Sequence, residues 1–162
     1  TCSRRPAGGG TRLRQTKPKS QLPQRFTEIH RAKMSQRPEM DLDALTEIII
    51  GLAMKVHSNL GRGLLESAYE QAMMFELRRN GLNARNQVAI PVIYEGEIIE
   101  PAFRADIVVE DRVILELKSV QNLDDSAYKQ LFTYLRLSGM KAGLLFNFHE
   151  RLLRDGIKRM IL

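Results

Sequence analysis

Residues 103–120 read FRADIVVEDRVILELKSV, and this stretch decides the fold that we expect. Two apolar runs, 103–109 and 113–120, flank a polar turn at 110–112, which is the pattern of two adjacent β-strands. Both runs are apolar at nearly every position, so we expect central strands that are covered on both faces. Four charged residues interrupt the runs, and three of them, Asp106, Glu116 and Lys118, lie among their most apolar positions. A core rarely accepts such charges unless they pair with one another or hold a metal ion.

The spacing of these charges suggests a site for a hard cation. Glu116 and Lys118 are two residues apart and project from the same face of their strand. A three-residue turn at 110–112 places Asp106 opposite Glu116, whereas a two-residue turn places the two acids on opposite faces. Directly opposed Cβ atoms lie about 5 Å apart, close enough for two carboxylates to share an ion such as Mg²⁺. The metal hypothesis therefore predicts the odd-length turn. The alternative is a network of Asp, Glu and Lys ion pairs that binds nothing.

Helical periodicity surrounds the expected strands. Apolar residues from Leu42 to Val56 recur at spacings of three and four and predict a first helix from Asp41 to the glycines at 61 and 63. A second helix follows at 64–80, and its expected buried side is Leu65, Ala68, Tyr69, Ala72, Met73 and Phe75. The remaining expected elements are strands at 88–94, 97–100, 103–109 and 113–120, a helix at 124–138, and strands at 142–148 and 157–162. This order predicts an α/β fold with a mixed central sheet flanked by helices.

The helices add candidate site residues at helical spacing. Gln130 and Tyr134 are four apart in the last predicted helix and share one face. Gln130 could brace the lysine or a metal-bound water, or it could be an ordinary exposed glutamine. Glu66 and Tyr69 are three apart in the second predicted helix. Glu66 could supply a further carboxylate to the cation, or it could only interact favourably with the helix dipole.

These residues form motifs that resemble a known family. Gly63-Leu64-Leu65-Glu66-Ser67-Ala68-Tyr69 has the pattern G-x-x-E-x-x-Y, and Asp106 with Glu116-Leu117-Lys118 has the pattern of an acid followed by E-x-K. Gln130-Leu131-Phe132-Thr133-Tyr134 is similar to the Q-x-x-x-Y motif of RecB-like nucleases. From 43 to 161 the chain resembles the GxxExxY family, a bacterial branch of the PD-(D/E)XK nuclease superfamily. Ala105 stands where the superfamily's name has Pro, a departure that leaves the ligand in place.

The resemblance implies a restriction-endonuclease-like αβββαβ core and a metal-dependent nuclease that hydrolyses phosphodiester bonds. It implies that Mg²⁺ or Mn²⁺ is held by Asp106, Glu116, the carbonyl of Leu117 and Glu66. It also implies the catalytic residues Asp106, Glu116, Lys118 and Gln130, with Lys118 orienting or helping to deprotonate the attacking water. The substrate-binding candidates are Tyr134, Tyr69 and His57. Packing is the alternative for both tyrosines, and a partly buried, hydrogen-bonded role is the alternative for His57.

Charge divides the chain into two parts. Residues 1–38 hold ten Lys and Arg against one acid, a net charge of +9, whereas residues 39–162 hold fifteen against eighteen, a net charge of −3. We expect residues 1–39 to be a disordered basic tail that is not native to the protein, because they are rich in Gly and Pro and the first methionines are Met34 and Met40. The alternative is a basic arm that holds phosphates. We expect residues 40–162 to be the nuclease-like domain.

Composition narrows the compartment and the partners. The single cysteine, Cys2, excludes an intrachain disulfide, and no apolar run approaches the about 20 residues that span a bilayer. We therefore expect a cytoplasmic protein that does not bind membranes. The resemblance implies that its partner is nucleic acid, DNA rather than RNA, and the oligomeric state stays open between a monomer and a homodimer. The alternative function is a catalytically weak or inactive nuclease-fold module that binds nucleic acid or a protein partner. A purely structural dimer component is a third alternative.

Overall fold

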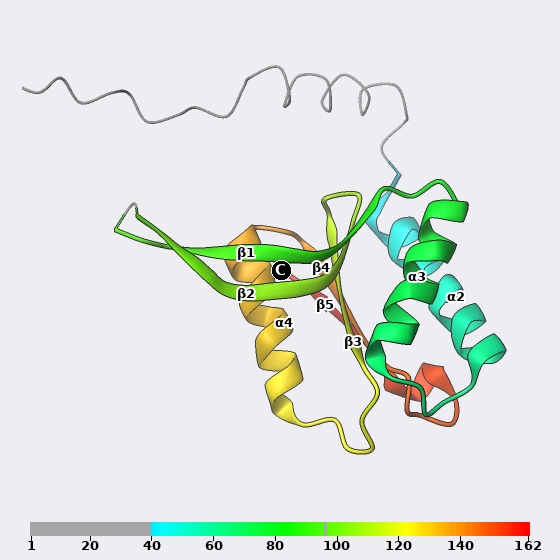
Figure 1. Ribbon diagram of the computed structural model, residues 1–162. Coiled ribbons are helices and arrows are strands. Elements are labelled where there is room, and N and C mark those ends of the chain that lie inside the picture. Colours follow the sequence, from blue (N-terminus) through cyan, green and yellow to red (C-terminus); the bar gives the residue numbers. More distant parts are fainter. Residues whose placement is uncertain (1–39, 96) are drawn as a thin grey trace, which may run out of the picture. The chain divides into compact units, whose positions relative to one another are not determined.

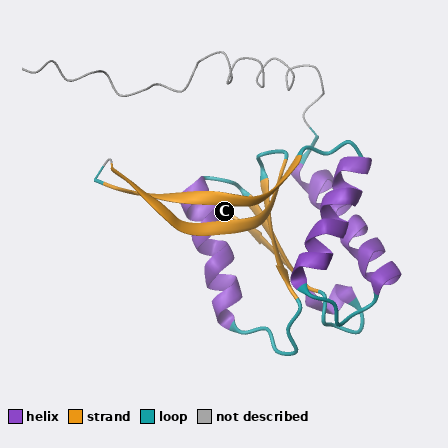
Figure 2. Ribbon diagram, viewed as in Figure 1, coloured by secondary structure: helices purple, strands orange, loops and turns teal. Residues whose placement is uncertain are grey.

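A five-stranded mixed sheet separates two layers of helices in the computed structural model (Figure 1). The structure describes residues 40–95 and 97–162, and the predictions for residues 1–39 lie outside this part of the chain. Helices α2 (Leu42–Leu60) and α3 (Glu66–Arg79) lie together on one side of the sheet, and α4 (Asp125–Ser138) lies on the other (Figure 2). None of the described helices is long and apolar enough to cross a membrane.

The strands stand in the sheet in their order along the chain. They are β1 (Ala84–Tyr94), β2 (Glu97–Val109), β3 (Val113–Lys118), β4 (Ala142–Asn147) and β5 (Ile157–Ile161). Only β3 and β4 are parallel among these pairs, because α4 carries the chain back between them, and a short 3₁₀ helix at Leu153–Gly156 precedes β5. The predicted class, an α/β fold with helices on both sides of a mixed sheet, is confirmed.

Local capping explains where the helices begin and end. The carboxylate of Asp41 accepts the backbone N–H groups of Asp43 and Ala44 at the start of α2. Asp124 accepts the N–H of Ser126 in the same way at the start of α4. Gly139 ends α4 in the left-handed conformation, with a φ of 71°, which suits a residue without a Cβ.

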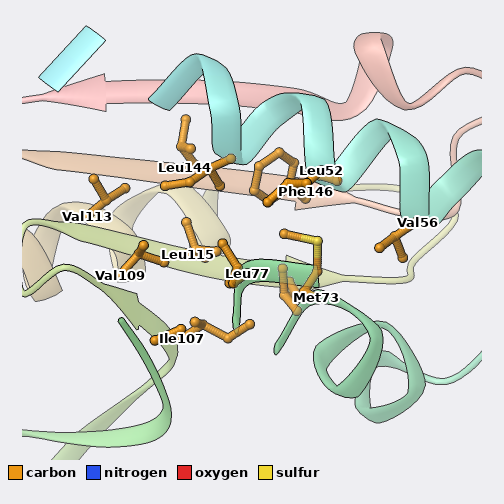
Figure 3. Packing of buried hydrophobic residues seen from close by; sticks show 14 of the residues in the cluster. Leu52, Val56, Met73, Leu77, Ile107, Val109, Val113, Leu115, Leu144 and Phe146 are labelled. Carbon is orange, nitrogen blue, oxygen red and sulfur yellow. The ribbon is translucent and has the colours of Figure 1, made fainter. Parts of the chain in front are cut away.

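Two apolar cores lie on the two faces of the sheet. The larger core packs α2 and α3 against the sheet and includes Leu52, Val56, Met73, Leu77, Ile107, Val109, Val113, Leu115, Leu144 and Phe146 (Figure 3). The smaller core packs α4 against the other face and includes Val108, Ile114, Leu131 and Leu145. β3 therefore alternates between two buried layers, which explains why it is apolar at nearly every position.

The structure corrects several expected details. Strands predicted separately at 97–100 and 103–109 form one strand, β2, and α3 begins at Glu66 rather than at residue 64. Leu65 and Phe75 were expected in the core but are 78% and 61% exposed. The buried side of α3 is formed instead by Tyr69, Met73, Met74, Glu76 and Leu77. These residues recur at the same helical period, so the error lies in which of two adjacent faces meets the sheet.

The turn between β2 and β3 has the odd length that the metal hypothesis requires. Val109 pairs with Val113, so three residues form the turn. Glu110 and Asp111 both adopt positive φ angles, of 52° and 53°. Acidic residues in this conformation are uncommon, and the backbone N–H of Glu110 is fixed by a 2.8 Å bond to the carbonyl of Asn83.

Candidate active site

The site lies where β2 and β3 separate. Their paired residues end at Ile107 and Leu115, and the next positions in this register are Asp106 and Glu116. The carboxylate of Asp106 accepts the backbone N–H of Leu117 at 2.7 Å. A side chain therefore takes the bond that a carbonyl would make in a continued ladder. The three-residue turn sets the register that leads to these two positions, and the charge of Asp106 acts on Glu116.

Glu116 is the most constrained residue of the site. It lies in the middle of an apolar strand and is 1% exposed. Its Oε1 accepts a hydrogen bond of 2.6 Å from Nζ of Lys118. Its Oε2 is buried and has no hydrogen-bond partner in the described part of the chain. A buried carboxylate oxygen without a partner is costly, so this atom points to a missing cation or proton.

Burial and mutual repulsion shift the proton affinities of the charged residues. Burial, together with the nearby charge of Asp106, raises the pKa of Glu116 to about 7. Burial also raises the pKa of Asp106, although the N–H of Leu117 opposes the shift. Burial alone would lower the pKa of Lys118, but the hydrogen bond and charge of Glu116 outweigh it and raise that pKa. The lysine therefore stays protonated while the acids compete for protons.

The loop before α3 is fastened to the end of β3. Oε1 of Glu66 accepts the backbone N–H of Ser119 at 3.0 Å, and Oγ of Ser119 donates to the carbonyl of Leu64 at 2.8 Å. The charge of Glu66 also contributes to the raised pKa values of Asp106 and Glu116. The structure thus brings Glu66 to the same end of the sheet as the two acids.

Tyr69 holds the same loop from inside. Its hydroxyl donates to the carbonyl of Gly61 at 2.8 Å and accepts the N–H of Leu64 at 3.2 Å. Its ring is fully buried and stacks on Phe148 with the ring centroids 4.3 Å apart. This environment supports the packing alternative for Tyr69 over direct contact with a substrate.

Gln130 and Tyr134 meet on the face of α4 toward the sheet. Nε2 of Gln130 donates to the hydroxyl of Tyr134 at 2.6 Å. Burial raises the pKa of Tyr134, and the negative charge of Glu116 raises it further. Tyr134 thus lies within electrostatic range of the acids, and Gln130 is hydrogen-bonded to Tyr134.

The family comparison agrees with this arrangement. The family model described as the PD-(D/E)XK nuclease superfamily matches residues 43–160. The chain belongs to this superfamily. Its mixed sheet with flanking helices is the restriction-endonuclease-like core of PD-(D/E)XK proteins. Members of this superfamily commonly use divalent metals, and the membership of this chain in it supports a nuclease function.

The other comparisons add little to the superfamily assignment. No curated protein matches the chain. One solved structure, titled "Crystal structure of SSO0001", is similar over 86% of this chain and 77% of that one, with 18% identity and a TM-score of 0.38. At this score the likeness carries no argument about fold or function.

The donor set fits a divalent ion in the manner of a PD-(D/E)XK site. Among the described residues, no group of three or more His, Cys, Asp and Glu side chains is arranged to hold a metal by itself. Asp106 and Glu116 nevertheless supply two hard carboxylates, and the unpartnered Oε2 of Glu116 is the atom that a cation would satisfy. In this superfamily member a backbone carbonyl and water would have to complete the shell.

His57 lies apart from the charged residues. Its Nε2 is 2.9 Å from the carbonyl of Glu150, and its ring centroid is 6.2 Å from that of Phe148. The side chain is partly buried. These contacts support the alternative of a hydrogen-bonded structural histidine, and none of them joins His57 to the acids.

Two residues with evident roles escaped the sequence reasoning. The charge of Glu70 contributes to the raised pKa of Asp106, and its position one turn after Glu66 was the available signal. Asn147 is fully buried, and its amide both accepts the N–H and donates to the carbonyl of Val120. These two bonds fix the backbone just after the end of β3. The sequence signal for this role was a polar residue at the end of an otherwise apolar strand.

Proposed function

We propose that this chain is a divalent-metal-dependent nuclease of the GxxExxY family, which hydrolyses phosphodiester bonds in nucleic acid. One observation carries the proposal: the carboxylate of Glu116 is buried near the charge of Asp106, and one of its oxygens has no partner among residues 40–95 and 97–162. Burial of the second oxygen, Oε2, is unfavourable in a purely structural role, because Lys118 satisfies only Oε1.

The metal ligands that we propose are the carboxylates of Asp106 and Glu116 and the carbonyl of Leu117, with Glu66 as an additional acid. When bound, Mg²⁺ or Mn²⁺ would lower the pKa of a coordinated water and offset charge on the phosphate oxygens. Occupation would also lower the pKa of Glu116, since the ion binds only the ionised carboxylate.

Lys118 and Gln130 complete the proposed catalytic residues. Lys118 remains protonated beside Glu116, so we assign it to orient the attacking water and to stabilise charge that develops on phosphorus oxygens. We assign Gln130 an indirect role, because its Nε2 donates to the hydroxyl of Tyr134 and the charge of Glu116 raises the pKa of that hydroxyl. Tyr134 is 3% exposed and packs against Phe103 with the ring centroids 5.6 Å apart, so the packing alternative suits it as it suits Tyr69. His57 also serves the scaffold.

The proposed substrate is nucleic acid, DNA rather than RNA, in the cytoplasm, and the proposed functional unit is residues 40–162, alone or as a homodimer. The G-x-x-E-x-x-Y motif supports the family assignment because each of its named residues is used: Glu66 and Tyr69 fasten the loop that follows Gly63 to β3 and Phe148.

A second candidate function is a weakly active or inactive module that binds nucleic acid or a protein partner. It is favoured by the excess of acids in residues 39–162, eighteen against fifteen basic residues. Such a surface attracts phosphates poorly without a bound metal.

Cleavage of labelled DNA by the full chain separates the two candidates. We expect hydrolysis with Mn²⁺ or Mg²⁺, none with a chelator, and a loss of at least about 100-fold in Asp106→Ala and in Glu116→Gln. Glu47→Gln, which changes an exposed acid of α2, is the matched control and should cleave like wild type. Calorimetric titration with Mn²⁺ gives a second readout, and equal Mn²⁺ binding by wild type and Glu116→Gln would contradict the proposed site.

A further inference from the structure

A hollow lies between α3 and β1, on the side of the sheet that α3 covers. Its volume is ≈ 530 Å³. It is lined by Gln71, Met74, Phe75, Arg78, Arg79 and Asn86. Apart from Met74 these residues are exposed, so the hollow opens to solvent.

The lining combines an exposed aromatic ring with two guanidinium groups. Phe75 is 61% exposed, although it is large enough to be core. Arg78 and Arg79 follow it by three and four residues, so all three lie on one part of the helix surface. A base can stack on such a ring, and guanidinium groups bind backbone phosphates well. Phe75, Arg78 and Arg79 thus form a local basic and aromatic patch in a part of the chain, residues 39–162, that has more acidic than basic residues.

The hollow adjoins the acids through the start of β1. Nδ2 of Asn86, which lines the hollow, donates to Oε1 of Glu70 at 2.8 Å. Asn86 also pairs with Ile107, a residue of the larger core, and so shares the face of the sheet that α3 covers. Glu70 in turn acts electrostatically on Asp106. A strand bound in the hollow would therefore lie on the α3 side of the sheet, with Asn86 and Glu70 between it and Asp106.

We propose that this hollow binds a single-stranded segment of the nucleic acid, with a base stacked on Phe75 and phosphates paired with Arg78 and Arg79. The inference rests on the proposed nuclease function and adds the strandedness of the substrate. A duplex keeps its bases stacked on one another, so it cannot present a free base face to Phe75. An unpaired strand can.

The test measures binding apart from cleavage. Fluorescence anisotropy of the full chain, in the presence of a chelator, is followed with a labelled single strand of about 12 nucleotides, as DNA and as RNA, and with the corresponding duplex. We expect the single strand to bind more tightly than the duplex. Phe75→Ala should weaken single-strand binding about tenfold. Arg78→Ala and Arg79→Ala should each reduce the slope of log K against log salt by about 0.7.

The chain offers matched controls on α4. Phe132 and Arg136 are an exposed aromatic and an exposed arginine four residues apart, outside the hollow. Phe132→Ala and Arg136→Ala should bind the single strand like wild type. Unchanged melting temperatures of all variants establish that the fold is retained.

Several results would overturn the inference. These are equal single-strand affinity of Phe75→Ala and wild type, tighter binding of the duplex, and absence of single-strand binding by wild type. Sedimentation velocity covers a further outcome: if Phe75→Ala dissociates a dimer and leaves DNA affinity unchanged, the hollow is an interface between copies. Metal-dependent cleavage by a chain that fails these binding tests would leave the proposed function standing and reject the hollow alone.

Discussion

The carboxylate of Asp106 and the backbone N–H of Leu117 are joined by a 2.7 Å hydrogen bond at the point where β2 and β3 part. The side chain of Asp106 thus accepts a backbone N–H that a carbonyl of β2 would accept if the two strands stayed paired. This bond holds Asp106 next to Glu116 although both are penalised by burial and by each other's charge. The hydrogen bond from Leu117 partly offsets the cost of burying two neighbouring carboxylates, because Asp106 replaces a main-chain acceptor.

Asp106→Asn and Asp106→Ala should separate these two roles. Asparagine keeps an oxygen acceptor for Leu117 and removes the repulsion with Glu116, so we expect a melting temperature at or above that of wild type. Alanine leaves the N–H of Leu117 without its partner and should lower the free energy of unfolding by about 1–3 kcal/mol. Both should abolish metal-dependent cleavage. Thermal melts and a DNA cleavage assay check these outcomes, and a destabilised Asp106→Asn would refute the dual role.

The stability of the metal-free protein should fall as the pH rises through the range of Glu116. Its folded-state pKa is about 7, against an ordinary value of 4.5, so the folded protein binds this proton more tightly than the unfolded chain does. Unfolding free energy should therefore decrease between pH 4.5 and about 7 and level off above that range. The shift corresponds to at most about 3 kcal/mol. Denaturant titrations at pH 5 and pH 8 measure the difference.

Glu116→Gln and added Mn²⁺ supply the controls for this pH dependence. The glutamine variant cannot titrate at this position, so most of the difference between pH 5 and pH 8 should disappear. Mn²⁺ should stabilise wild type more at pH 8 than at pH 5, because binding must displace the proton of Glu116 at the lower pH. An identical pH dependence in wild type and Glu116→Gln would show that another group is responsible.

Gly143 in β4 sets how closely α4 approaches the sheet. A Cβ at this position would lie 2.8 Å from Cδ1 of Leu131, which is too close. Gly143→Ala should therefore destabilise the protein by about 1–3 kcal/mol through overpacking. Gly51→Ala is the matched control, because its Cβ would meet nothing within 4 Å on an exposed side of α2. The control should stabilise by up to about 1 kcal/mol, as alanine replaces glycine inside a helix.

Local features of the sequence predicted the register of β2 and β3 and the range of α4. The number of residues in the turn decides which residues of β2 and β3 oppose each other. The register that leads up to Asp106 and Glu116 could therefore be predicted from the sequence. The helix expected at 124–138 is observed as α4 at Asp125–Ser138, and the caps at its two ends, Asp124 and Gly139, act locally. Phe75 was assigned to the core wrongly, since a helical stripe defines a face but the sheet decides how that face is oriented.

The remaining parts of the site depend on contacts between distant segments. Glu66 reaches Ser119 across 53 residues, and Asn147 reaches Val120 across 27. The spacing of residues in the sequence predicts neither hydrogen bond. The same holds for the bond of Asp106 to Leu117, because it exists only where the two strands diverge, and divergence is set by packing rather than by residue type.

Tyr69→Phe should weaken cleavage more than it weakens the fold. The substitution keeps the ring that stacks on Phe148 and removes the hydroxyl that joins Gly61 and Leu64. Water can reach these backbone groups because both residues are exposed, so we expect a loss of only about 1 kcal/mol in stability. The loop should nonetheless lose its fixed position beside Ser119, and cleavage should fall about tenfold. Tyr94→Phe, an exposed tyrosine of β1, is the control, and a Tyr69→Phe variant that cleaves like Tyr94→Phe would show that the hydroxyl serves stability alone.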